Sequence, residues 1–168
     1  MTRRWLQSVV AVMALLMAGT LAQDGLTPKT PIVTVLSAEP VAVAPGGSVR
    51  VELRFRVTPG YHINSSRPLS EFLIPTRLKM SPPAGLTPGV VVYPEGTDLT
   101  FSFSPKEKLN VYAGEFIVRA ELRAPASTLA GSYKVPGELR YQGCNDPACF
   151  PPMKLAVEFE VTVRKPRS

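Results

Sequence analysis

The chain has 168 residues and a formal net charge of +6, which is enough for one domain with a short leader. Its 18 prolines and 12 glycines are unfavourable in helix interiors and argue against a mainly helical protein. Two cysteines exclude a disulfide-rich scaffold, and a single histidine excludes a histidine-rich metal centre. Basic and acidic residues are mixed without a basic tract, so we expect no nucleic-acid partner.

The N-terminal segment has the pattern of a secretory signal peptide. Arg3 and Arg4 give it a positive start, and a long apolar run without charged residues follows. Thr20 and Ala22 are the small residues that precede a cleavage site. We therefore predict a signal peptide over residues 1–22 and export of the protein. An apolar run of this length would also be able to anchor the chain in a bilayer if it were left uncut.

Most of the remaining chain alternates between apolar and polar residues. The clearest segments are 50–57, 116–123 and 155–163, in which every second residue is apolar. Weaker strand candidates are 32–36, 76–80, 89–93 and 133–141. Turns that contain proline and glycine separate these segments, and no amphipathic helix is evident. We therefore predict an all-β fold, an immunoglobulin-like antiparallel β-sandwich, with residues 23–168 forming a single domain.

Segment 93–112 is less regular than its neighbours. It contains Phe101, Phe103 and the charged cluster Lys106-Glu107-Lys108, and its apolar residues do not alternate over a long stretch. We predict that this segment forms a long loop over one end of the sandwich.

Both cysteines lie in the connection between a predicted strand that ends near Tyr141 and another that begins near Met153. Four residues separate Cys144 from Cys149, and the turn formers among them allow the two Cα atoms to approach disulfide distance. Closing so short a loop contributes only about 2 kcal/mol through chain entropy, so stability is a weak reason for a bridge. The spacing leaves two alternatives open, an inert structural disulfide or a thiol–disulfide exchange pair.

Exchange requires one thiolate that attacks and a second thiol that resolves the mixed disulfide. His62, the only histidine, is a candidate to tune the pair or to relay a proton, whereas Asp146 would disfavour a thiolate. The alternative, which the sequence favours, makes His62 a partly exposed strand residue that is hydrogen-bonded to backbone. A third hypothesis adds His62 and Met153 to the cysteines as ligands of Cu(I), with a marginal number of ligands.

The sequence around the cysteines resembles the active-site segment of the N-terminal periplasmic domain of the disulfide reductase DsbD. The resemblance lies in Tyr141-Gln142-Gly143-Cys144 and in Cys149-Phe150-Pro151-Pro152. Residues 59–64 are similar to a Gly-aromatic-His segment of that family, and Ile74-Pro75-Thr76 also fits. The resemblance extends over residues 32–163. It implies an immunoglobulin-like fold, a periplasmic location and a redox-active pair that passes electrons to thioredoxin-like proteins.

The resemblance also implies roles for individual residues. In that family the second cysteine forms the mixed disulfide with partners, which assigns this role to Cys149 and the resolving role to Cys144. A loop caps and shields the pair in the family, and residues 94–105 are its counterpart by order along the chain, with Phe101 or Phe103 as the lid. Further candidates for tuning or capping the pair are Tyr61, His62 and Asp146.

The resemblance implies partners as well. This chain carries neither a membrane electron conduit nor a thioredoxin-like domain, so we expect it to receive electrons from a separate membrane thiol reductant. Thioredoxin-like periplasmic proteins would accept them from a monomer that needs no metal and no organic cofactor. Cytochrome c maturation, disulfide isomerase recycling and peroxide defence are equally compatible pathways. The alternative from another class is an exported β-sandwich binding or adaptor module whose disulfide is inert.

Overall fold

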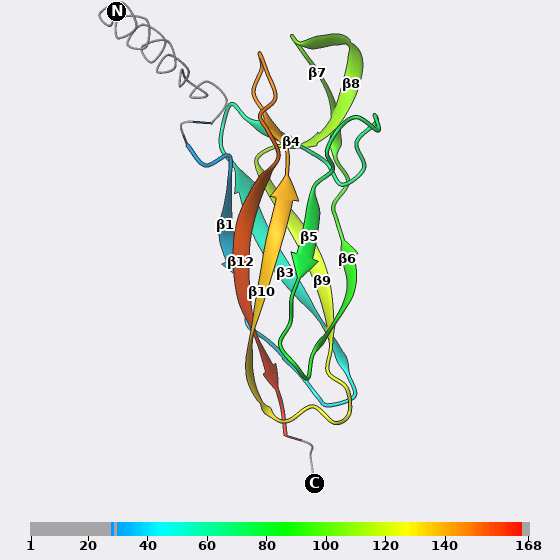
Figure 1. Cartoon of the computed structure of the whole chain (residues 1–168), viewed down its shortest axis with the longest axis vertical. Helices are drawn as coiled ribbons and strands as arrows, with labels where there is room; N and C mark the ends of the chain where they lie inside the picture. Colours follow the sequence, from blue (N-terminus) through cyan, green and yellow to red (C-terminus); the bar gives the residue numbers. More distant parts are fainter. Residues whose placement is uncertain (1–27, 29, 166–168) are drawn as a thin grey trace, which may run out of the picture.

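The computed structural model of the chain describes residues 28 and 30–165, and these residues form 12 β-strands and no helix (Figure 1). The strands are β1 (Val33–Ala38), β2 (Val41–Val43), β3 (Ser48–Val57), β4 (His62–Asn64), β5 (Arg77–Met80), β6 (Thr87–Val92), β7 (Thr97–Phe101), β8 (Ser104–Tyr112), β9 (Glu115–Arg123), β10 (Gly131–Tyr141), β11 (Gly143–Cys144) and β12 (Met153–Val163). In this part of the chain, no helix is long and apolar enough to cross a membrane. The predicted signal peptide lies outside the described residues.

Two four-stranded sheets form the body of the molecule (Figure 1). One has the strand order β1-β3-β9-β6 and the other the order β2-β12-β10-β5. The described pairings within these sheets are antiparallel, apart from β2 with β12, which is parallel. The predicted all-β, immunoglobulin-like sandwich is confirmed. The three clearest alternating segments are β3, β9 and β12.

The core lies between the apolar faces of these strands. In β3 every second residue from Val51 to Val57 is buried, and the residues between them are exposed. Strand β12 repeats this pattern from Val157 to Val163. Burying an apolar side chain of this kind contributes about 1.5–3 kcal/mol, and a register slip of one residue would expose the whole set. The alternation therefore fixes which face of each strand meets the other sheet.

A third, smaller sheet lies at one end of the sandwich. Its strand order is β11-β4-β8-β7, so β4 pairs with the strand that contains the first cysteine on one side and with β8 on the other. In Figure 1 the orange loop between β10 and β12 and the green β7–β8 hairpin both project from this end of the molecule. The small sheet therefore brings the cysteine loop and the hairpin to the same end.

Segment 93–112 is not the long loop that the sequence predicted. Strands β7 and β8 pair antiparallel as a hairpin around a turn at Ser102-Phe103. Most residues of β7 and of the first half of β8 are exposed, because the hairpin extends beyond the body of the sandwich. The alternation that marks a half-buried strand is therefore missing here, which is why the pattern indicated a loop.

Candidate redox-active site

Cys144 and Cys149 form a disulfide at this end of the sandwich. Their Cα atoms lie 3.9 Å apart, and the two residues form an isolated antiparallel bridge. Cys144 ends β11 and is 0% exposed, whereas Cys149 follows the turn and is partly exposed. Of the two residues, Cys149 is therefore the more accessible to another protein.

The loop between the cysteines is a hydrogen-bonded turn. The backbone N–H of Asn145 donates to the carbonyl oxygen of Ala148 (2.9 Å), and the N–H of Ala148 donates to Oδ1 of Asn145 (3.1 Å). The N–H of Phe150 donates to the carbonyl oxygen of Gly143 (2.9 Å) and closes the base of the loop. None of these three bonds involves sulfur, so the disulfide is not alone in holding the shape of the loop.

Gln142 and Asn64 anchor this loop to the sandwich. Oε1 of Gln142 accepts hydrogen bonds from Nδ2 of Asn64 (3.1 Å) and from the backbone N–H of Ile74 (3.3 Å). Nε2 of Gln142 donates to the carbonyl oxygen of Phe150 (3.2 Å). Neither residue was among the predicted site residues. Their only signal in the sequence was that both lie within the segments that carry the family resemblance.

Gly143 precedes the first cysteine at a position where a side chain does not fit. A Cβ atom there would lie 2.5 Å from Cδ1 of Ile32 and 3.3 Å from Cε of Met153. Because Ile32 is fully buried, it has little room to move away. The close approach lets β11 pack directly on the body of the sandwich and fixes the position of Cys144.

His62 lies opposite Cys144 in the antiparallel pair of β4 and β11. Directly opposite residues point to the same face of a sheet, with Cβ atoms about 4.5–5.5 Å apart. His62 is 4% exposed, and its Nε2 atom is buried without a hydrogen-bond partner. The expectation of a partly exposed histidine is therefore wrong, because the hairpin covers the ring.

Burial lowers the pKa of His62 from 6.5 to about 4, and the negative charge of Asp146 opposes this effect. The cause is desolvation, which disfavours the charged imidazolium because the side chain is almost fully buried. The imidazole is consequently neutral near pH 7 and carries one nitrogen that is free to accept a proton.

The β7–β8 hairpin covers His62. The ring of Phe101 stacks on the imidazole, with 3.8 Å between the ring centroids and 14° between the planes. Phe103 stacks on Phe101 with 5.6 Å between centroids. Between them, Oγ of Ser102 is within hydrogen-bonding distance of the carbonyl oxygen (2.8 Å) and of Oδ2 (3.0 Å) of Asp146. The turn of the hairpin is thus fastened both to the histidine and to the cysteine loop.

Tyr61 contacts the residue that follows the second cysteine. Its ring contacts that of Phe150, with 6.0 Å between centroids and a tilt of 46°. Among the aromatic contacts of the described residues, none joins Tyr61 to the hairpin. No group of three or more His, Cys, Asp or Glu side chains in the described ranges is arranged to hold a metal ion. The hypothetical Cu(I) ligands Cys144 and Cys149 are bonded to each other.

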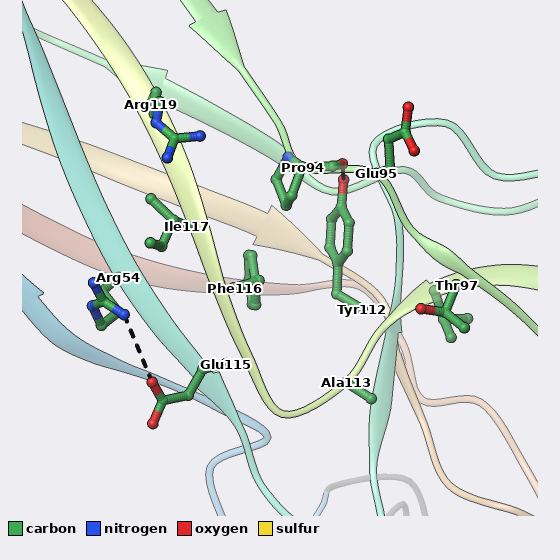
Figure 2. Close-up of a pocket in the computed structure, with 11 residues that line it drawn as sticks. Arg54, Pro94, Glu95, Thr97, Tyr112, Ala113, Glu115, Phe116, Ile117 and Arg119 are labelled. Carbon is green, nitrogen blue, oxygen red and sulfur yellow. Dashed lines mark hydrogen bonds and ion pairs between the residues drawn. The ribbon is translucent and has the colours of Figure 1, made fainter.

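A separate pocket of about 380 Å³ lies where β8 leads into β9, and neither cysteine lines it (Figure 2). The hydroxyl group of Tyr112 points toward Pro94 and lies 2.9 Å from its carbonyl oxygen and 3.0 Å from Oγ of Ser66. Glu115 forms an ion pair with Arg54 (3.9 Å) at the opposite side of the pocket. Tyr112 therefore ties the segment that enters the hairpin to the sandwich.

Residues 30–160 match the family model described as thiol:disulfide interchange protein DsbD, N-terminal. The chain belongs to the DsbD N-terminal family. The matched region of this DsbD N-terminal domain contains both cysteines, His62 and the complete β7–β8 hairpin.

One solved structure supports the same fold, and two others are similar to the chain. The N-terminal periplasmic domain of ScsB from Proteus mirabilis is 14% identical with a TM-score of 0.54, over 84% of this chain and 49% of that chain. This chain thus spans about half the length of the ScsB domain. The DsbD N-terminal domain of Neisseria meningitidis in the reduced form is 24% identical, with a TM-score of 0.41, over 68% of this chain and 82% of that chain. The same domain in a complex with the PilB N-terminal domain is 25% identical, with a TM-score of 0.45, over 82% and 88% of the two chains. No curated protein sequence matches the chain.

Proposed function

We propose that this protein exchanges electrons with thioredoxin-like periplasmic proteins through Cys144 and Cys149. Membership of the DsbD N-terminal family supports thiol–disulfide interchange as its chemistry. The observation that carries the proposal is a disulfide in a projecting loop, with one cysteine buried and the other partly exposed. That asymmetry suits a pair in which one sulfur meets the partner and the other resolves the complex.

In the reduced protein, the Cys149 thiolate attacks one sulfur of a partner disulfide. A bond forms between Cys149 and that sulfur, and the second sulfur of the partner leaves as a thiolate. Cys144 then loses its proton and attacks Sγ of Cys149, which releases the first partner sulfur as a thiolate. Two electrons have passed to the partner, and the Cys144–Cys149 disulfide has formed again. A separate membrane thiol reductant restores the two thiols by the reverse exchange.

In this proposal residues 94–105 are a cap that limits access to the pair. The Phe101–His62 stack and the Ser102–Asp146 hydrogen bond hold the turn of the hairpin on the site. A partner displaces these contacts as it docks. The leader over residues 1–22 would deliver the domain to the periplasm, an oxidising compartment in which an uncovered pair of thiols would be exposed to unspecific oxidation.

Trapping of mixed disulfides tests the proposal. Cys144→Ala keeps the attacking thiol and removes the resolving one. It should therefore accumulate a mixed disulfide with oxidised thioredoxin, which dithiothreitol cleaves by reduction. Cys149→Ala is the matched control and should accumulate none. Adducts of Cys149→Ala alone would reverse the roles of the two cysteines. Absence of adducts from both variants would contradict electron exchange with thioredoxin-like proteins.

A further inference from the structure

The cap covers a polar atom that has no partner in the disulfide form. Nε2 of His62 is buried, and no hydrogen-bond donor or acceptor among the described residues reaches it. Buried polar atoms without partners are uncommon and require an explanation, of which a redox or catalytic role is one. A neutral imidazole has one nitrogen with a free lone pair, which can accept a hydrogen bond or a proton from a donor.

Reduction of the disulfide creates a donor beside this histidine. Cys144 lies opposite His62 across β4 and β11, so both side chains point to the same face of the small sheet. The sulfur of Cys144 carries no proton in the disulfide and carries an S–H in the dithiol. Because Cys144 is 0% exposed, bulk water is poorly placed to take that proton.

We propose that His62 is the base that accepts the proton of the Cys144 thiol when the mixed disulfide is resolved. The inference rests on the proposed function, in which Cys144 is the resolving cysteine. The S–H proton moves to Nε2, and the electron pair left on sulfur forms the bond to Sγ of Cys149. The bond between Cys149 and the partner breaks, and the partner sulfur leaves with the electron pair. The proton on His62 then passes to that thiolate.

The groups around the imidazole come from three elements. Strand β11 contributes Cys144, the hairpin contributes Phe101 and Phe103, and the cysteine loop contributes Asp146. Of these groups only the carboxylate of Asp146 is charged, and it stabilises the protonated ring. The same carboxylate accepts the hydrogen bond from Ser102 that holds the turn of the hairpin. The base and the cap therefore share one acidic group.

The position of the cap controls the strength of this base. While Phe101 covers the ring, burial keeps the pKa of His62 at about 4, too low for efficient removal of a thiol proton. When a partner displaces the hairpin, water reaches the ring and its pKa returns toward 6.5, close to the working pH. Proton removal from Cys144 is thus favoured only after the partner has opened the site.

The test uses an aryl disulfide, 5,5′-dithiobis(2-nitrobenzoate), and protein that has been reduced with dithiothreitol and separated from it. One coloured aryl thiolate leaves when Cys149 attacks, and the second leaves when Cys144 resolves the mixed disulfide. His62→Phe keeps an aromatic ring to stack against Phe101 and removes the base. Tyr133→Phe is the control, because Tyr133 pairs with Val161 near the end of β10 that is remote from Tyr141 and the cysteines. We expect the second phase of His62→Phe to slow by about tenfold or more, with the first phase unchanged.

The pH profile and a second variant separate the outcomes. In His62→Phe no base assists the thiol. The rate of the second phase should therefore increase with pH up to about 8.5, the ordinary pKa of a thiol. If His62→Phe does not fold, His62→Gln is measured instead, and added imidazole should restore its second phase. If the second phase has the same rate and pH profile in the unmodified protein and in the His62 variant, the role of His62 is overturned and the proposed function is left intact. Failure of the unmodified protein to release any aryl thiolate would instead contradict the proposed function.

Discussion

Protonation of His62 should destabilise the oxidised protein in mild acid. The folded protein holds the pKa of this ring at about 4, against 6.5 for an unburied histidine. A histidine with a lowered pKa contributes its full stability above pH 6.5, and this contribution is lost as the pH falls toward 4, because the unfolded chain binds the proton first. Between pH 7.5 and 4.5 the loss is about 2.5 kcal/mol.

Urea unfolding of the oxidised protein at these two pH values measures the loss. His62→Phe has no group that titrates at this position, and it keeps a ring for the stack with Phe101. Carboxylates titrate in both proteins, including that of Glu115, whose pKa is lowered by its hydrogen bond to Arg56, so their effect cancels in the comparison. We expect the unmodified protein to lose about 2.5 kcal/mol more than His62→Phe. Equal losses in the two proteins would refute the buried, neutral histidine.

Three further substitutions test the packing of the site. Phe101→Ala should raise the rate at which dithiothreitol reduces the disulfide several-fold, while Phe72→Ala, which alters a side chain that is 87% exposed, should leave that rate unchanged. Gly143→Ala should lower the free energy of unfolding by about 1–3 kcal/mol because its methyl group overlaps a buried isoleucine. Gly131→Ala is the control, since its added Cβ would meet no atom closer than 4.0 Å. Tyr112→Phe should cost about 1–3 kcal/mol in urea unfolding, because it removes the hydroxyl that bonds to the buried Ser66 and to the partly buried carbonyl group of Pro94. An unchanged unfolding midpoint would contradict that role.

The sandwich could be predicted from the sequence because its main strands each have one buried and one exposed face. Strands β3, β9 and β12 lie within the body of the molecule, and their period of two is a direct result of that position. Strands β7 and β8 belong to a hairpin that extends beyond the body, where both faces of the ribbon are largely exposed. Their sequence therefore lacks the pattern that would have marked them as strands.

In the site, too, features encoded by neighbouring residues could be predicted, whereas features that depend on contacts between distant residues could not. The cysteine pair was visible because the motif is contiguous, and turn formers such as Asn145 act within the loop itself. The burial of His62 was not visible, because it depends on Phe101 folding back over the ring. The hydrogen bond between Asn64 and Gln142 joins residues 78 positions apart in the sequence, so no local pattern predicts it.

The reduction potential of the Cys144–Cys149 pair tests the central claim most directly. Protein equilibrated in glutathione and dithiothreitol redox buffers can be labelled with a maleimide, which reacts with the two thiols of the reduced form only. A working exchange pair should have a potential above about −300 mV, within reach of thioredoxin-like couples. A potential below about −300 mV, with both sulfurs unlabelled in glutathione buffers, would identify a structural disulfide and contradict electron exchange.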